Sequence, residues 1–484
     1  MAPTERTTTV EVQDRPLSWV ESHRFVPRTF VQPGLGFLRQ EAAGGIVMLL
    51  AAVAAIAWAN SPGSDGYFAL FSTKIEIAFG DFHFHHLSEL TVQEWINDAL
   101  MAIFFFVVGL EIKRELVVGE LRDPKAAALP VVAALGGMAV PAGIYLLFNT
   151  ALFPEAGVAR GWGIPMATDI AFAVGIVSLA GRKVPVAAKL FLLALAIVDD
   201  LGAIIVIALF YTAELSLPWL AAAAVGLLVV HGMKRVDVRS IAAYLVVGAF
   251  VWLATLESGV HATVAGVALA LMTPVAAFYD PRKFAAAAAP LVARVDAYLP
   301  SDKALHEADH HTVERVQSII DDLQRLARES LSPLSRLQFR LSSLSSFIIV
   351  PLFAFANAGV VISADAIGGA RTDPIMLGVL FGLLVGKVVG VTGGAWIAVR
   401  LGIGRMPART TWRHLVGLGL LAGIGFTVAL FVAALSFDDP SQLDSAKIGI
   451  FAASLLAGVA GFAWLRACPE VEPAESAQEP VHTS

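Results

Sequence analysis

The chain has 484 residues, of which 57% are hydrophobic and only 15% charged, and its mean hydropathy is +0.72. This composition excludes an ordinary soluble protein, in which about 25% of residues are charged, and indicates a polytopic membrane protein of the all-α class. The net charge of −6 excludes little, because the orientation of a membrane protein depends on where Lys and Arg lie. The single cysteine, Cys468, excludes an internal disulfide framework.

Twelve apolar stretches are candidate membrane spans, because about 20 predominantly apolar residues cross a bilayer as a helix. In chain order they lie near residues 43–60, 95–112, 126–148, 161–181, 186–211, 215–232, 239–256, 260–278, 345–363, 374–399, 414–437 and 447–466. The spans near 215, 239 and 260 are short, so tilted or broken helices are expected there. Together they predict a transmembrane domain over 43–466, with a cytoplasmic tail over 1–42 and a disordered tail over 467–484.

Charges in the connections predict the orientation. Basic residues cluster in alternate connections: Lys113, Arg114, Arg122, Lys125; Arg182, Lys183, Lys189; Lys234, Arg235, Arg239; and Arg400, Arg405, Arg409, Arg413. Acidic residues dominate the others: Asp81, Glu89, Glu155, Glu214, Glu257, Asp373, Asp438 and Asp439. The positive-inside rule then places both termini in the cytoplasm, which requires an even number of spans.

The connection after the first span has the pattern of a β-hairpin over residues 74–87. Apolar side chains alternate over 75–79, and Gly80-Asp81 supplies a two-residue turn that pairs Phe79 with Phe82. A lone two-stranded hairpin is only marginally stable, and its open edge favours pairing with a second copy of the chain. A homodimer contact is therefore one interpretation. A local lid on the protein surface is the other.

A polar insertion over 280–335 contains an amphipathic helix. Its apolar residues recur at helical spacing: Val313, Val316, Ile320, Leu323 and Leu326. We expect a cytoplasmic helix that lies on the membrane surface or packs on the inner face. The insertion also holds His306-Glu307-Ala308-Asp309-His310, which matches the H-E-x-x-H zinc-protease pattern. An exposed helix start explains these residues better than a metalloprotease, because nothing around them would form a substrate groove.

Four charged residues stand alone in apolar stretches long enough to cross the membrane: Asp169, Asp199, Asp200 and Lys387. Each charge at bilayer depth costs about 2.5–3.5 kcal/mol, so the four together cost roughly 10–14 kcal/mol. A cost comparable to a domain's whole net stability indicates a function, and three carboxylates with one ammonium suggest an ion or proton pathway.

The residues before Asp169 predict an interrupted helix. Pro165 removes a backbone donor, and a break near Thr168 leaves free polar groups that are tolerated only inside protein or beside a water-filled cavity. The span near 414–437 has a similar weakness at Gly419, Gly423 and Gly425. Two interrupted helices in corresponding halves point to an inverted-repeat transporter. A kinked helix in which Asp169 caps its own backbone remains the alternative.

The adjacent pair Asp199-Asp200 is the most specific feature of the sequence. Neighbouring helical residues point about 100° apart, so the pair addresses two partners at one depth. Two close carboxylates resist double ionisation, so their titrations are coupled and protons compete with a metal cation. Oxygen ligands suit a hard cation such as Na⁺ or Li⁺. The alternative is a buried structural pair.

Lys387 follows Gly378-x-x-x-Gly382-x-x-x-Gly386, a small-residue face that allows close helix approach. Its ammonium would pair with an Asp in one state, or neutralise the C-terminal ends of broken helices. A fixed structural salt bridge is the alternative. Asp98 and Glu111 lie near the two ends of another span, which suggests an accessory carboxylate at one mouth and a charged funnel at the other. An ordinary solvated helix end is an equal alternative to the funnel.

From about residue 35 to 466, apart from the insertion, the chain resembles the NhaA-type sodium/proton antiporter family. The strings that carry the resemblance are Phe104–Glu111 with Lys113–Leu116, Ala167–Phe172, Val198–Asp200, Ser258–Thr263, Pro351–Gly359 and Gly423–Thr427.

The resemblance implies electrogenic antiport of one Na⁺ or Li⁺ outward for two protons inward, which serves pH and sodium homeostasis at the plasma membrane. Asp200 would be the main cation ligand and proton carrier, and Asp199 would bind the cation or pair with Lys387. Thr168 and Asp169 would belong to the crossing of two broken helices, and the hairpin to a dimer contact. The accessory or pH-sensing residues would be Asp98, Glu111, Arg114, Glu115 and His261. No enzyme activity, cofactor or nucleic-acid partner is expected.

The chain departs from the family where strongly pH-activated members carry acidic and histidine residues. Gln338, Phe339 and Ser342 stand there, so we expect weaker alkaline activation. A proton-coupled anion carrier on the same scaffold is the main rival hypothesis, and the adjacent Asp pair favours a cation.

Overall fold

The computed structural model describes residues 43–75, 90–155, 157–212, 215–238, 240–298, 309–361 and 372–469. Within them the α-helices are α2 (Ala43–Ala59), α3 (Ser64–Ser72), α4 (Val92–Trp95), α5 (Met101–Val117), α6 (Pro124–Leu146), α7 (Ile170–Ala180), α8 (Val186–Phe210), α9 (Leu217–Arg235), α10 (Ile241–Glu257), α11 (Thr263–Met272), α12 (Phe284–Tyr298), α13 (His310–Glu329), α14 (Pro333–Leu344), α15 (Val350–Asn357), α17 (Pro374–Phe381), α18 (Lys387–Arg400), α19 (Trp412–Ala422), α20 (Phe426–Ser436) and α21 (Pro440–Arg466). The 3-10 and π-helical turns are η3 (Ile96–Leu100), η4 (Glu120–Arg122), η5 (Leu147–Leu152), η6 (Ala159–Met166), η7 (Gly181–Lys183), η8 (Pro281–Lys283), η10 (Ser345–Ile349) and η11 (Gly382–Gly386).

The described residues form a helical, multi-pass membrane protein. Eight continuous helices are long and apolar enough to cross a membrane, and counting the bent pairs α2/α3 and α19/α20 as spans gives up to ten. Two shorter apolar helices, Ala242–Glu257 and Thr263–Met272, accompany them. The number of twelve spans and the inverted repeat therefore stay predictions.

Proline explains two of the predicted boundaries that are wrong. The predicted span over 260–278 ends at Met272, because Thr273 is extended (φ −61°, ψ 132°) as the residue before Pro274 must be. The span predicted to begin near residue 345 begins at Pro333, where the Ser332 hydroxyl accepts a bond from the Ser335 amide and Pro333 occupies the first turn.

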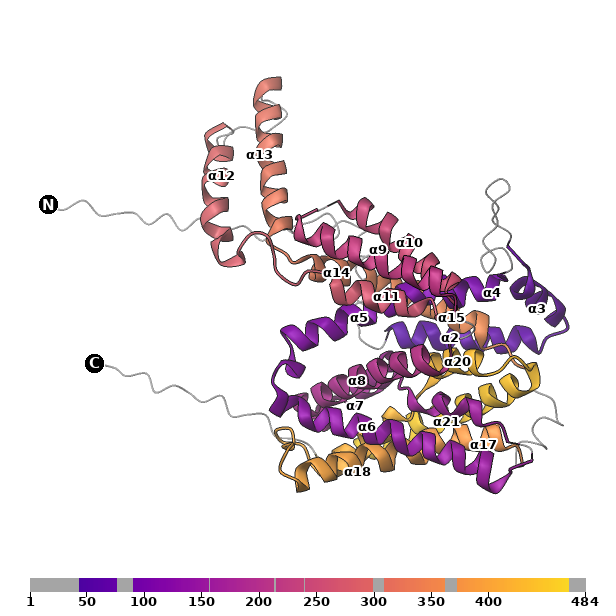
Figure 1. Cartoon of the computed structure of the whole chain (residues 1–484). Coiled ribbons are helices and arrows are strands. Elements are labelled where there is room, and N and C mark those ends of the chain that lie inside the picture. The colour runs from indigo at the N-terminus through magenta and orange to yellow at the C-terminus, as the bar shows by residue number, and fades with distance from the viewer. Residues whose placement is uncertain are drawn as a thin grey trace, which may run out of the picture.

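The membrane helices pack as two groups (Figure 1). We call the first the site bundle, which consists of η6, α6, α7, α8, η11 and α17–α21; α6 packs along α18 and α8, and α21 along α17 and α19. The second is the companion bundle, which consists of α2, α3, α5, α9–α11, α14 and α15; α5 packs along α11, α9 along α10, and α2 along α15. Contacts of α5 with α8, α2 with α7 and α15 with α20 join the two.

Glycines bring α6 and α18 into backbone contact. A Cβ atom added at Gly390 would collide with the carbonyl group of Gly136, and one added at Gly394 would lie 3.0 Å from Ala133 Cα. Bulkier residues would force the two helices apart. This close approach holds Lys387, one turn before Gly390, against the centre of the site bundle.

The insertion forms an antiparallel helix pair, α12 and α13, beside the cytoplasmic ends predicted for the spans (Figure 1). The amphipathic helix predicted from residues 313–326 lies within α13. Val316 is buried and Val313, Leu323 and Leu326 are partly buried, so four of the five predicted positions are confirmed. The exception is Ile320, which is 41% exposed, and the neighbouring Ile319 is buried in its place. His306 lies outside the described residues, and His310 has an exposed side chain 3.4 Å from Glu314.

Residues 76–87, which are most of the hairpin predicted over 74–87, lie outside the described residues. At its base Lys74 and Thr91 form an isolated antiparallel bridge. A regular turn at Gly80-Asp81 would place residue 74 opposite residue 87, so this bridge does not follow the predicted register.

Candidate functional site

Two interrupted spans meet at the centre of the site bundle. After η6 the chain is extended at Ala167 (φ −85°, ψ 150°) and Asp169 (φ −81°, ψ 100°) before α7 begins. The other interruption separates α19 from α20, which are bent by 45°. The Asp169 amide donates to the Ile424 carbonyl oxygen at 2.6 Å, so the two breaks satisfy each other's backbone groups.

The sequence placed these breaks with one error. Pro165 lies in η6 just before the first break, and the second spans Gly423–Gly425. Gly419 does not interrupt its helix but lies inside α19. A Cβ atom there would be 3.3 Å from Val388 Cα, so this glycine serves the packing of α19 on α18.

Asp169 is fully hydrogen-bonded across the crossing. Its Oδ1 accepts from the Phe172 amide at 3.1 Å, which caps α7, and its Oδ2 accepts from the Thr427 hydroxyl at 2.6 Å and amide at 3.2 Å. Asp169 therefore caps its own helix, as the alternative prediction had it, and also ties that helix to α20. Thr427 was not among the predicted site residues; its signal was a hydroxyl two residues after Gly425, in the first turn of α20.

Asp199, Lys387 and Thr168 form one buried cluster with no exposed surface. Asp199 Oδ2 lies 2.5 Å from Lys387 Nζ and 2.7 Å from Thr168 Oγ1. The Thr168 hydroxyl also lies 2.8 Å from the Ala422 carbonyl oxygen, and since it has one proton it donates to one acceptor at a time.

Lys387 also donates to the Met166 carbonyl oxygen at the end of η6. The last carbonyl groups of a helix lack intrahelical partners and carry partial negative charge, which an ammonium offsets. Lys387 thus makes both contacts that were predicted for it, one with an Asp and one with the end of a broken helix. Pairing in only one state and a fixed salt bridge both stay predictions.

Two carboxylate oxygens at this centre have no hydrogen-bond partner: Asp199 Oδ1 and Asp200 Oδ1. Asp200 is 2% exposed and lies within electrostatic reach of Asp169, Asp199, Glu111 and Lys387. Buried polar oxygens are costly unless a partner satisfies them. A proton or a small cation would satisfy both.

The donor set suits a transiently bound hard cation better than a tightly held metal. Within the described ranges, no three His, Cys, Asp or Glu side chains lie close enough to hold a metal ion. A cation here would rely on the Asp pair, the Thr168 hydroxyl and carbonyl groups released at the breaks, all of which are oxygen ligands.

The accessory residues divide between two places. Asp98 Oδ1 lies 3.9 Å from His261 Nε2, and the His261 ring packs at 5.2 Å from Phe431. Glu111 hydrogen-bonds to Gln338, one of the residues at which the chain departs from the family pattern. Glu115 Oε2 accepts from the Glu120 amide at 3.1 Å.

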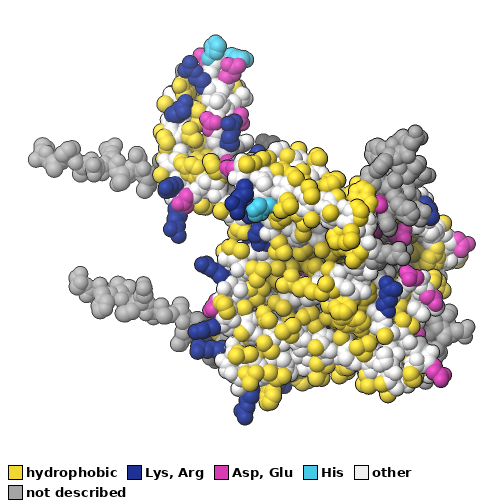
Figure 2. Space-filling model, viewed as in Figure 1, with side chains coloured by type: hydrophobic (Ala, Val, Ile, Leu, Met, Phe, Trp, Pro, Cys, Tyr) yellow, Lys and Arg dark blue, Asp and Glu magenta, His cyan; other side chains and the backbone are white. Residues whose placement is uncertain are grey.

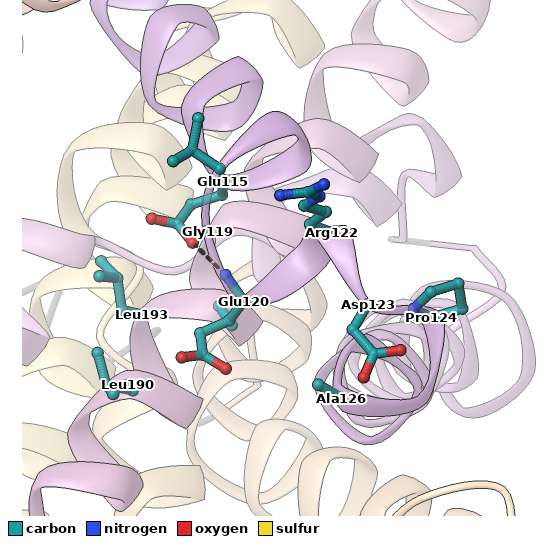
Figure 3. Close-up of a pocket in the computed structure, with 11 residues that line it drawn as sticks. Glu115, Gly119, Glu120, Arg122, Asp123, Pro124, Ala126, Leu190 and Leu193 are labelled. Atoms are coloured by element: carbon teal, nitrogen blue, oxygen red, sulfur yellow. Dashed lines mark hydrogen bonds between the residues drawn. The ribbon is translucent and has the colours of Figure 1, made fainter. Parts of the chain in front are cut away.

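An open pocket of about 630 Å³ lies between the end of α5, the start of α6 and α8 (Figure 3). Polar lining residues include Glu115, Glu120, Arg122 and Asp123, and its α8 wall is Leu190, Leu193 and Ala194. Arg114, predicted with Glu115 as part of the funnel, does not line it. Leu193 precedes Asp200 by two helical turns, about 10 Å along the same helix face.

Comparison with known proteins identifies the family. The family model described as Na⁺/H⁺ antiporter 1 matches residues 36–465. A protein named Na(+)/H(+) antiporter NhaA from Oleidesulfovibrio alaskensis is 45% identical over 432 residues, which cover 89% of this chain and 92% of that protein. A protein of the same name from Sulfurimonas denitrificans is 45% identical over 432 residues, with 89% and 94% covered. The resemblance seen in the sequence is thereby confirmed, and the chain belongs to the Na⁺/H⁺ antiporter 1 family of membrane transporters.

Proposed function

We propose that the protein extrudes Na⁺ or Li⁺ in exchange for protons at the Asp199-Asp200 pair. The observation that supports this most is the pair of buried, unpartnered oxygens beside two helix breaks. Protons and the cation would compete for these oxygens, so that loading one expels the other. Family membership supports Na⁺ and H⁺ as the transported ions.

In the proposed cycle the Lys387–Asp199 ion pair marks the state without a bound cation. A cation that reaches Asp200 attracts Asp199 as its second ligand, and Asp199 then leaves Lys387. The Thr168 hydroxyl lies within hydrogen-bonding distance of both Asp199 and the Ala422 carbonyl oxygen. When it donates its one proton to Ala422, its oxygen becomes a ligand for the cation beside Asp199. After the cation is released, protons bind the site again and the Lys387–Asp199 ion pair re-forms.

We propose a stoichiometry of two protons for one sodium ion, as the family resemblance implies. Two titrating groups at one site, Asp200 and the Asp199–Lys387 pair, provide two places for a proton. Each cycle would then move one net charge and depend on the membrane potential, which gives the exchanger a role in pH and sodium homeostasis.

Alternating access would come from relative motion of the two bundles. The pocket on the Glu115 side reaches Leu193 and Ala194 of α8, the helix that carries Asp200 about 10 Å further along, which supports a cytoplasmic access route. Figure 2 shows Lys and Arg gathered mainly at the edge where this pocket opens, and Asp and Glu mainly at the opposite edge. This pattern supports cytoplasmic termini, a plasma-membrane domain over 43–466 and an external hairpin, for which we retain the role of dimer contact.

Inside-out membrane vesicles test the proposal. With an acidic interior and a pH-sensitive dye, addition of Na⁺ or Li⁺ should release protons from the lumen. The rate should depend on the membrane potential, so collapsing the potential with valinomycin and K⁺ should change it. A rate that ignores the potential would reject electrogenic exchange, and no cation-dependent proton release would reject antiport itself.

A further inference from the structure

One buried cation has no role in the proposed exchange. Lys447 lies in α21, about 10 Å along the helix from Pro440, and is 7% exposed. A buried ammonium within a span is costly and indicates a function. Its nearest acid is Asp444, whose Oδ1 lies 3.6 Å away on the same helix and whose side chain is 41% exposed.

The hydrogen bond of Lys447 crosses from one bundle to the other. Its Nζ donates to the Gly359 carbonyl oxygen at 3.1 Å, and Gly359 lies just beyond the end of α15. Lys447 belongs to the site bundle and Gly359 to the companion bundle. An ammonium bound to a carbonyl group is a charge-assisted bond, and it lies where low dielectric strengthens it.

The segment that receives this bond is held in place by the companion bundle. The Gly359 amide donates to Tyr67 Oη at 3.1 Å, and the Tyr67 hydroxyl donates to the Phe355 carbonyl oxygen at 2.7 Å. A Cβ atom at residue 359 would overlap the Tyr67 ring, so glycine is required there. The acceptor is therefore fixed to its own bundle, and motion of α21 away from α15 must break the bond.

We propose that Lys447 is a latch that keeps the external seam between the two bundles closed while the cytoplasmic side is accessible. This inference rests on the proposed alternating access, and on the orientation that places the end of α15 outside. Lys447 is a positioning residue, because its ammonium acts on the equilibrium between conformations and does not touch the transported ion. Loss of the latch should favour the externally open state.

The test is thiol accessibility of a reporter beside the latch. Val360 is 1% exposed and follows Gly359, so Val360→Cys in a Cys468→Ser background gives one buried thiol at the seam. Membrane-impermeant maleimide added outside intact cells should label it slowly in the parent. Lys447→Met should raise the labelling rate by roughly ten- to a hundredfold, because the lost hydrogen bond to a charged group shifts the equilibrium by about that factor. Lys447→Arg should restore slow labelling.

Two further variants separate the latch from other roles. Asp444→Asn should leave labelling slow, because the cross-bundle acceptor is a carbonyl group. Tyr67→Phe frees the receiving segment and should speed labelling, which keeps the test decisive if Lys447→Met does not fold. Unchanged labelling in both Lys447→Met and Tyr67→Phe would overturn the latch. Absence of Na⁺-driven proton release in the parent would instead overturn the proposed function, whatever the labelling shows.

Discussion

Helix α8 of the site bundle and helix α9 of the companion bundle differ in what they face. In α8, which carries the Asp pair, 61% of the most apolar window is buried, whereas in α9 of the companion bundle the share is 17%. The interrupted span with Asp169 is buried to the same extent as α8. Exposed apolar residues of α9, such as Leu217 and Leu228, suit contact with lipid. The three carboxylates of the site thus lie in spans that other helices shield, where protein groups replace water as partners.

The largest effect should follow from removing the least satisfied carboxylate of the site bundle. Asp200→Asn deletes the charge and replaces one carboxylate oxygen with an amide nitrogen that cannot take up a proton, so Na⁺-driven proton release should fall to the level of empty vesicles. Asp65→Asn, at an exposed position of the companion bundle, is the matched control and should exchange like the parent. Exchange by Asp200→Asn at the parent's rate would refute the site assignment.

Removing the buried Lys387 ammonium should lower the free energy of unfolding more than removal of an exposed charge from the companion bundle. Lys387→Met leaves Asp199 buried beside one hydroxyl, and breaking such a pair costs about 3–5 kcal/mol. Thermal unfolding in detergent measures the loss. The double variant Lys387→Met/Asp199→Asn should recover part of it, and a double variant as unstable as the single one would argue against the pair.

The glycine contact between α6 and α18 should tolerate no side chain. Gly390→Ala forces a methyl group against the Gly136 carbonyl group, and overpacking of this kind costs about 1–3 kcal/mol or more. Gly393→Ala is the matched control, because nothing lies within 4 Å of its added Cβ. Alanine there should be neutral or slightly stabilising. Equal melting temperatures for the two variants would contradict the close approach.

The crossing of the two breaks should respond more mildly. Thr427→Val removes the hydroxyl that donates to Asp169 Oδ2 while it keeps the side-chain shape, and such a loss costs about 1–3 kcal/mol. Exchange should slow by roughly tenfold if the crossing positions the site. Thr427→Ser should retain most activity. If Thr427→Val exchanged at the parent's rate and were equally stable, the hydroxyl would contribute to neither exchange nor stability.

The smallest expected effect concerns pH. Glu111 hydrogen-bonds to the neutral Gln338, and Phe339 is 83% exposed, so the titratable partners expected at the start of that span are missing. Exchange should therefore change little between mildly acidic and alkaline pH, beyond the competition between protons and Na⁺ at the site. A steep alkaline activation in proton-flux assays would show that other groups supply the switch.

The sequence predicted the features of the site that depend on isolated charges and helix breakers. Asp199, Lys387 and Thr168 lie together in the structure, and the breaks follow Pro165 and Gly423, because charge burial and proline act locally and are visible in one chain. The sequence did not predict Thr427, Lys447 or the burial of Ile319 in place of Ile320 in α13. Those depend on which helices lie side by side, and Lys447 near a predicted span end resembled an ordinary interfacial lysine. The hairpin and the number of spans stay predictions.

Proton release on Na⁺ binding tests most directly whether the Asp199-Asp200 oxygens hold either protons or a cation. Titration calorimetry of the purified protein, in two buffers of different ionisation enthalpy, counts the protons released when Na⁺ binds. We predict net proton release in the parent, and neither binding nor release in Asp200→Asn. Binding of Na⁺ without proton release, or the same release after Asp200→Asn, would contradict the claim that these oxygens hold either protons or a cation.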